Sequence, residues 1–323
     1  MNAYPALWKA NKKYSWMKLR NGSLKDYVPD HYELGYPLVN YGYEKYGPEF
    51  WSKVTQDASR FKGLFYPFQH AVKTRAGVSY KTFRQQAFDH FKKQNAERQV
   101  ATITKSPGDN TGITNLFPVK KSYVTNRVFA YQTNDNALVY LKTSYRKRPA
   151  FYIKDEKGER RLRARDISME DQFSYRNGKI VYASYQNDPR WRWRDYSVIN
   201  ILDVATKKQH TITSRSKYFS PDISESGNKV AAVQVSPDGK SELHILDANS
   251  GEVQHKISSN EINLYTDPKF INEDSVVTPV RLKDGKMTLA VIDLKGGNTL
   301  RLTPPSFNVI GYPAVSGRSI YFT

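Results

Sequence analysis

The second part of the sequence repeats a small set of turn residues at a nearly constant spacing. Four aspartates, each ending a segment of alternating apolar and polar residues, recur at separations of 48, 44 and 46 residues: Asp155, Asp203, Asp247 and Asp293. Three prolines, at positions 221, 268 and 313, recur at separations of 47 and 45. Two Asp-Gly pairs, beginning at Asp238 and Asp284, lie 46 residues apart. Three independent landmarks share one period, which indicates a repeated supersecondary unit.

Each repeat has the pattern of four short strands joined by tight turns. An Asp-Gly pair between alternating segments is a strong signal for a two-residue hairpin loop. Units of about 45 residues with four strands are typical of β-propeller blades, whereas a β-sandwich has no reason to keep a constant spacing. We expect blades over residues 124–168, 171–215, 218–262 and 265–308, and the start of a fifth at Tyr312. Because a propeller normally closes so that no long edge stays unpaired, we expect the chain to be a fragment of a longer protein.

Residues 1–96 have a helical period instead. Asp30 and Glu33 have the spacing of a capping box, after which large side chains recur at helical spacing: Tyr32, Tyr36, Val39 and Tyr43. A later segment begins at the candidate N-cap Ser79 and carries an apolar stripe: Tyr80, Phe83, Ala87, Phe88 and Phe91. The predicted fold class is α followed by all-β. A small helical domain occupies residues 1–96, a linker 97–122, and a partial β-propeller of four-stranded blades 123–323.

Composition narrows the function classes. The formal net charge is +19, which is compatible with an anionic partner. No recognition-helix, zinc-finger or RNP-type pattern accompanies it, so nucleic acid is not the partner we predict. Cysteine is absent, which excludes disulfides and thiolate zinc sites. The sequence has no run of 18 apolar residues, so no membrane span is predicted.

Both parts resemble known families. The phrase "YFSPDISESGNKVAAVQVSPDGKSELHILDANSGEV" resembles the repeats of TolB-like propellers, over residues 123–323. The phrases "YSWMKLRNGSLKDYVPDHYELGYPLVNYGYEKYGPEFW" and "FYPFQHAVKTRAGVSYKTFRQQA" resemble the C-terminal helical part of bacterial gluzincin-type metallopeptidases. The two resemblances together imply an exported bacterial protein that joins a peptidase to a propeller, located in the periplasm or at the cell surface. The first residues lack the continuous apolar core of a signal peptide.

The chemistry of gluzincins depends on the motif HExxH and a downstream glutamate. This sequence contains no HExxH, so we predict no catalytic and no metal-binding residues in it. No cofactor is predicted for this chain, and the resemblance implies zinc only for a longer parent. A G-x-S-x-G elbow is also absent. The acidic pairs Glu170-Asp171 and Glu273-Asp274 are expected to be solvated turn residues rather than glycosidase acids.

The candidate binding residues lie in the stretch "NDPRWRWRDYS", where arginines alternate with tryptophans. In blade 2 the hairpin between the second and third strands is longer than in blades 3 and 4, and the excess is Arg190, Trp191, Arg192, Trp193, Arg194 and Asp195. If the hairpin continues as a twisted two-stranded ribbon, both tryptophans lie on one side and the arginines on the other. A second basic run, residues 144–165, lies in blade 1. The two basic segments either form one positive rim or are ordinary solvated surface.

Three interpretations of the tryptophans remain open at this stage. They pack on the helical domain, they line a site for a peptide or an envelope glycan, or they cap a blade edge. The function we predict is a non-catalytic fragment whose propeller recognises a substrate or partner: a peptide, a protein or an envelope glycan. The alternatives are a pure scaffold with a degenerate peptidase-like domain and, more weakly, a binder of anionic polymers.

Overall fold

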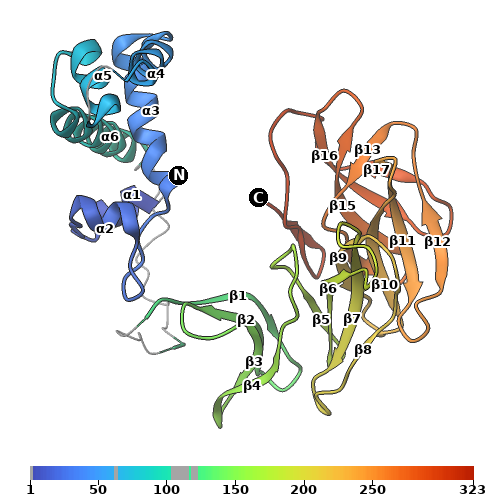
Figure 1. The fold of residues 1–323 in the computed structure, drawn as a ribbon. Helices are drawn as coiled ribbons and strands as arrows, with labels where there is room; N and C mark the ends of the chain where they lie inside the picture. The colour runs from blue at the N-terminus through green and yellow to red at the C-terminus, as the bar shows by residue number, and fades with distance from the viewer. Residues whose placement is uncertain (1–2, 62–64, 103–115, 118–122) are drawn as a thin grey trace. The chain divides into compact units, whose positions relative to one another are not determined.

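The computed structural model describes residues 3–61, 65–102, 116–117 and 123–323, and the chain divides into two compact units. These are a helical unit, Met1–Val124, and a propeller unit, Thr125–Thr323 (Figure 1). The linker predicted over 97–122 falls largely outside the described residues, and the last helix continues to Thr102. No helix within the described ranges is both long and apolar enough to cross a membrane.

The described part of the helical unit contains six helices. They are α1 (Ala3–Lys9), α2 (Trp16–Asn21), α3 (His31–Tyr46), α4 (Phe50–Ser59), α5 (Pro67–Ala76) and α6 (Tyr80–Thr102). The predicted capping box of α3 is confirmed, since Asp30 Oδ1 accepts from the Glu33 backbone N–H at 2.8 Å while Glu33 Oε2 accepts from the Asp30 N–H at 3.2 Å. The predicted cap Ser79 accepts from the Thr82 N–H at 3.1 Å.

The buried face of α3 is not the face that carries its regularly spaced large residues. Leu34, Leu38 and Tyr41 point into the core of the helical unit. Tyr32, Tyr36, Val39 and Tyr43, by contrast, are between 45% and 74% exposed. Both stripes have helical spacing, so only packing against α4 and α6 decides which one is buried.

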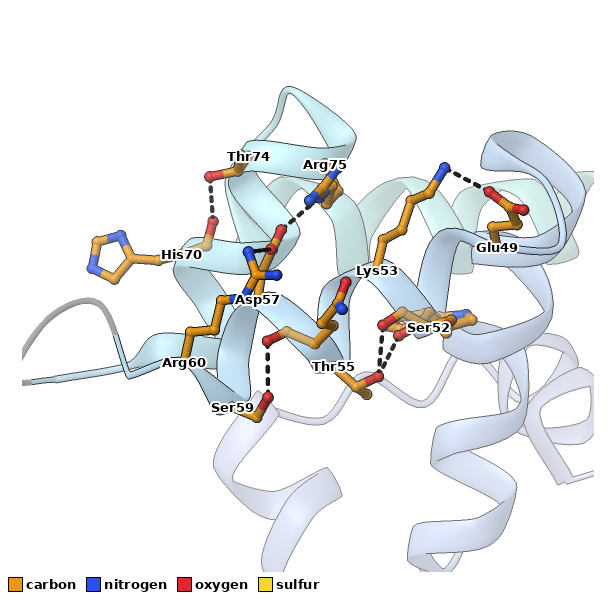
Figure 2. A network of polar contacts seen from close by, with 12 residues as sticks. Glu49, Ser52, Lys53, Thr55, Asp57, Ser59, Arg60, His70, Thr74 and Arg75 are labelled. Atoms are coloured by element: carbon orange, nitrogen blue, oxygen red, sulfur yellow. Dashed lines mark hydrogen bonds and ion pairs between the residues drawn. The ribbon is translucent and has the colours of Figure 1, made fainter.

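The core of the helical unit is largely aromatic. Phe83 of α6 is fully buried and stacks on Phe50 of α4 with ring centroids 5.8 Å apart. The predicted stripe of α6 is confirmed, because Phe83 and Ala87 are buried and its other members pack around them. At the surface, Asp57 of α4 accepts from Arg75 Nε of α5 at 2.6 Å and holds these two helices together (Figure 2).

Gly42 lets α3 approach the Trp51 ring closely. A Cβ on Gly42 would lie 2.4 Å from Trp51 Nε1, which donates to the Val39 carbonyl at 2.7 Å. We expect Gly42→Ala to destabilise the helical unit by about 1–3 kcal/mol, because the indole must move and loses this bond. Gly35→Ala in the same helix meets nothing within 4 Å, and we expect it to stabilise by up to about 1 kcal/mol. Urea unfolding followed by circular dichroism compares them, and equal effects would contradict the packing argument.

The propeller unit is built of antiparallel sheets in chain order. Blade 1 is β1 (Thr125–Gln132), β2 (Leu138–Ser144), β3 (Ala150–Asp155) and β4 (Gly158–Ala164). Blade 2 is β5 (Ser174–Arg176), β6 (Lys179–Asn187), β7 (Asp195–Asp203) and β8 (Gln209–Thr211). Blade 3 is β9 (Tyr218–Ile223), β10 (Lys229–Val235), β11 (Ser241–Asp247) and β12 (Val253–Ile257). Blade 4 is β13 (Ile262–Tyr265), β14 (Lys269–Asn272), β15 (Ser275–Leu282), β16 (Met287–Asp293) and β17 (Thr299–Arg301), and a two-stranded fifth sheet is β18 (Ala314–Ser316) and β19 (Ser319–Tyr321).

Each neighbouring pair of blades shares one hydrophobic core. Phe151 of blade 1 lies against Tyr182 of blade 2, with ring centroids 5.1 Å apart. Further clusters join blade 2 to blade 3, blade 3 to blade 4, and blade 4 to the fifth sheet. Sheets stacked face to face in sequence, each burying its faces on the next, form a partial β-propeller, as predicted (Figure 1).

The recurring aspartates hold the hairpin turns. Asp203 Oδ1 accepts from the Thr206 backbone N–H at 2.7 Å, and Asp247 Oδ1 accepts from the Ser250 N–H at 2.8 Å. Asp293 accepts in the same way from the Gly296 N–H at 3.0 Å, and Asp155 accepts from the Lys157 N–H, two residues on, at 3.0 Å. The period seen in the sequence is therefore the period of a turn in which a carboxylate accepts from backbone amides.

Candidate functional site

The hairpin between β6 and β7 carries the predicted binding residues. The two strands pair without a break from Lys179↔Asp203 to Asn187↔Asp195, so the extra length of blade 2 partly extends the ladder. The ladder ends there, and residues 188–194 form a separate turn, which we call the Arg-Trp loop. All of the predicted site residues except Asp195 belong to this loop.

Asp188 organises the Arg-Trp loop. Its Oδ1 accepts from the backbone N–H groups of Arg190 and Trp191 at 2.9 and 3.0 Å, and its Oδ2 accepts from the Tyr196 hydroxyl at 3.0 Å. The backbone N–H of Asp188 donates to the Arg194 carbonyl at 2.9 Å. The bonds from Arg190 and Trp191 lower the pKa of the Asp188 carboxyl. The carboxylate is therefore held in its charged, accepting form, which fixes the loop backbone.

The predicted alternation of tryptophans and arginines along a ribbon is wrong. Trp191 and Trp193 lie beyond the paired strands, in the turn held by Asp188. Pro189 has no N–H to give to a ladder, and the Asp188 side chain offers the backbone an alternative set of bonds. A turn closed by Arg194 N–H donating to the Trp191 carbonyl at 2.9 Å replaces the ribbon.

The loop presents two indoles and their guanidinium neighbours to solvent. Trp191 is 55% exposed and Trp193 is 89% exposed. Arg190 Cζ lies 5.0 Å from the Trp191 ring, and Arg192 Cζ lies 5.4 Å from the Trp193 ring. Each pair offers a flat apolar face beside a cation that binds carboxylates through two parallel hydrogen bonds. Such a surface suits a partner with acidic and apolar groups side by side.

Asp195 has a different role from its neighbours in the sequence. It is half-buried at the start of β7, opposite Asn187. A hydrogen bond to Asp195 raises the pKa of the Tyr185 phenol. Asp195 thus belongs to the base of the hairpin, which it helps to connect to β6, and not to the exposed part of the loop.

The basic run of blade 1 is split by the fold. Arg146, Lys147 and Arg148 are exposed in the β2–β3 loop, the counterpart of the Arg-Trp loop in the preceding blade. Arg160 pairs with Asp155 at 2.6 Å, and Arg165 is buried, donating to Asp171 Oδ1 at 3.1 Å. The run is therefore divided between the exposed β2–β3 loop, the exposed Arg161 and Arg163 of β4, and the buried Arg165.

A buried polar network between blades was missed by the sequence analysis. Glu170, expected to be solvated, has a carboxylate that accepts from the Ser220 backbone N–H at 2.7 Å and from its hydroxyl at 2.8 Å. Burial raises the pKa of Glu170. Asp222 of β9 pairs with Lys269 of β14 at 3.0 Å and accepts from the Phe270 backbone N–H at 2.8 Å.

The repeat contains a pattern that predicts the Asp222–Lys269 pair. Asp222 and Lys269 each follow one of the recurring prolines, so the two residues occupy equivalent positions in successive blades. Opposite charges at one repeat position indicate a contact between neighbouring blades, because equivalent innermost strands lie side by side. The Glu170 bonds join the segment between blades 1 and 2 to blade 3, and the Asp222 bonds join blade 3 to blade 4. Within the described ranges, no three His, Asp or Glu side chains are grouped so as to hold a metal ion.

Comparisons with known proteins bear on the fold. No family model matches the chain, and no curated protein matches it. Among solved structures, it is similar to a putative TolB from Agrobacterium tumefaciens, at 14% identity and a TM-score of 0.43, covering 53% of this chain and 63% of that one. TolB from Acinetobacter baumannii is similar at 15% identity and a TM-score of 0.46, covering 57% and 45%. An acylaminoacyl peptidase from Pyrococcus horikoshii is similar at 14% identity and a TM-score of 0.39, covering 57% and 33%.

These likenesses are distant, and the chain spans less than two thirds of the length of each of these structures. The propeller assignment rests on the strand pairing and on the cores shared between blades. Two of the similar structures are TolB proteins, the family that the blade phrases resemble. None of the three supports the resemblance of the helical unit to gluzincin-type metallopeptidases, which stays a prediction.

Proposed function

We propose that the propeller unit is a recognition module for an acidic protein partner, with the Arg-Trp loop as its main contact. The observation that carries the proposal is the pair of exposed indoles held by a fixed turn and flanked by guanidinium groups. Tryptophan and arginine are the residues that most often dominate protein interfaces. A loop fixed before binding loses little conformational entropy when the partner docks.

The wider setting of this function rests on resemblance. The similarity of the helical unit to gluzincin-type metallopeptidases favours a partner that is a peptidase substrate, with the peptidase activity, and any zinc, outside this chain. The same resemblance favours the periplasm or the cell surface as the location. The Arg-Trp loop favours recognition over a pure scaffold, because a scaffold has no need of two exposed indoles.

The proposal is tested with a panel of labelled peptides in which Asp or Glu alternates with apolar residues. We expect Trp191→Ala/Trp193→Ala to weaken binding at least about tenfold, because two interfacial indoles are lost. The melting temperature should stay unchanged, since both side chains are largely exposed. Fluorescence anisotropy measures the affinity, and Asp188→Ala should weaken binding with both indoles still present.

Phe307→Ala is the matched control. Phe307 is 76% exposed and lies 5.8 Å from Lys286 Nζ, so it is a second exposed aromatic beside a cation, in blade 4. We expect it to leave the affinity unchanged. Affinity unaffected by the double tryptophan change would overturn the proposal. If heparin binds as tightly as the acidic peptides, and its affinity falls steeply as the salt concentration rises, an anionic-polymer binder is favoured instead.

A further inference from the structure

The helical unit contains a groove that the recognition function does not use. It lies between α1, α3 and α6 and has a volume of about 390 Å³. The residues that matter for its chemistry are Tyr4, Trp8, Glu33, Tyr36, Glu44 and Phe91. The volume is within the range of small-ligand sites in proteins.

Aromatic rings form much of this groove. Tyr4 is buried, and its ring centroid lies 6.0 Å from that of Trp8. Phe91 is half-buried on α6, and Tyr36 is 50% exposed at the rim. The faces of such rings carry partial negative charge and attract cations.

The charged groups of the groove are all carboxylates. Glu33 and Glu44 line it, and no described Lys or Arg does so, although lysine and arginine outnumber the acidic residues of the chain by 50 to 31. Glu44 is fixed by Asn40 Nδ2 at 2.7 Å and by His90 Nε2 at 2.8 Å. Glu33 is fixed by the capping box of α3. Two carboxylates are therefore held in place beside the aromatic rings.

The pKa of the Tyr4 phenol reflects the negative charge around the groove. Burial raises the pKa of its phenol, and the carboxylates of Glu33 and Asp30 raise it further. Its hydroxyl is buried and has no hydrogen-bond partner among the described residues. A buried hydroxyl without a partner is costly. The site is thus negative, as the influence of Glu33 and Asp30 on the Tyr4 phenol indicates.

We propose that this groove, the ammonium groove, binds an alkylammonium group, presented as the lysine side chain of a partner peptide. The aromatic faces receive the methylene stem and the cation, and the two carboxylates supply the opposite charge. The preference for a cation applies only to the groove between α1, α3 and α6. The adjoining cavity, which shares Glu44, is also lined by Lys45 and Lys93.

The test uses the full chain labelled with 5-fluorotryptophan, with the Trp8 resonance assigned from Trp8→Phe. The probes are a blocked Gly-Lys-Gly peptide, its norleucine counterpart without the ammonium, and choline. We expect the lysine peptide to shift the Trp8 resonance in a saturable way and the norleucine peptide to leave it in place. Choline should bind more weakly than the lysine peptide.

Two variants and one control separate binding from folding. We expect Glu44→Gln to lower the affinity for the lysine peptide at least about fivefold, because a carboxylate contact is lost. Tyr36→Ala should lower this affinity by a similar factor, because a cation–π contact is lost. Tyr43→Ala is the control, because Tyr43 lies on the same helix, is 46% exposed and does not line the groove. Equal binding of the norleucine peptide, tighter binding of choline, or unchanged affinity in Glu44→Gln would each overturn the proposal.

Discussion

Asp222→Asn is expected to destabilise the propeller unit by about 3–5 kcal/mol, the usual cost of leaving one partner of a buried ion pair alone. The side chains of Lys269 and Asp222 are only 10% and 2% exposed. Burial by itself lowers the pKa of Lys269, but the Asp222 carboxylate, together with Tyr131 and Asp267, raises the pKa above its usual value. Without the carboxylate, the buried ammonium loses its hydrogen-bonded ion-pair partner, and the Phe270 N–H loses a charged acceptor.

Urea unfolding followed by the β-sheet signal in far-UV circular dichroism measures this effect. The matched control is Asp284→Asn, which removes the carboxylate of an exposed pair, Asp284–Lys286, with 52% and 40% side-chain exposure. We expect that change to cost less than about 1 kcal/mol. Replacing both buried partners, as Asp222→Leu/Lys269→Met, should recover most of the loss, because no buried charge remains. Similar losses at the buried and exposed sites would show that the network does not join the blades.

Gly251→Ala should destabilise the propeller unit by more than about 3 kcal/mol, which is exceptional for a surface turn. Gly251 has φ +74°, and a Cβ there would lie 1.7 Å from the backbone oxygen of Ile212 in the preceding repeat. That oxygen belongs to backbone, so it cannot move aside as a side chain does. The change must therefore separate the turn after β11 from the neighbouring blade.

Gly297→Ala isolates the conformational part of this effect. Gly297 occupies the equivalent turn of blade 4, has φ +69°, and meets nothing within 4 Å. Both glycines donate their N–H to the turn aspartate carbonyl at 2.9 Å. We expect Gly297→Ala to cost about 1–2 kcal/mol, the usual penalty of a left-handed backbone for an L-residue. Thermal unfolding of the two variants compares them, and equal costs would contradict the close approach of blades 2 and 3.

The sequence by itself determined the features that depend on neighbouring residues. The spacing of the turn aspartates predicted the blades, because one hairpin turn recurs in each repeat. Asp30 with Glu33 predicted the start of α3, because a capping box involves only four consecutive residues. In each case the groups that interact are close along the chain.

Only the tertiary structure decided the features that depend on distant residues. Both faces of α3 have helical spacing, and the packing of α4 and α6 selected the Leu34 face. The sequence identified Trp191 and Trp193 as unusual, but the Asp188 bonds set their positions. Glu170 became a partly buried acceptor because Ser220, far along the chain, lies beside it. A local pattern carries no record of which distant groups will surround it, and burial and partners are properties of those surroundings.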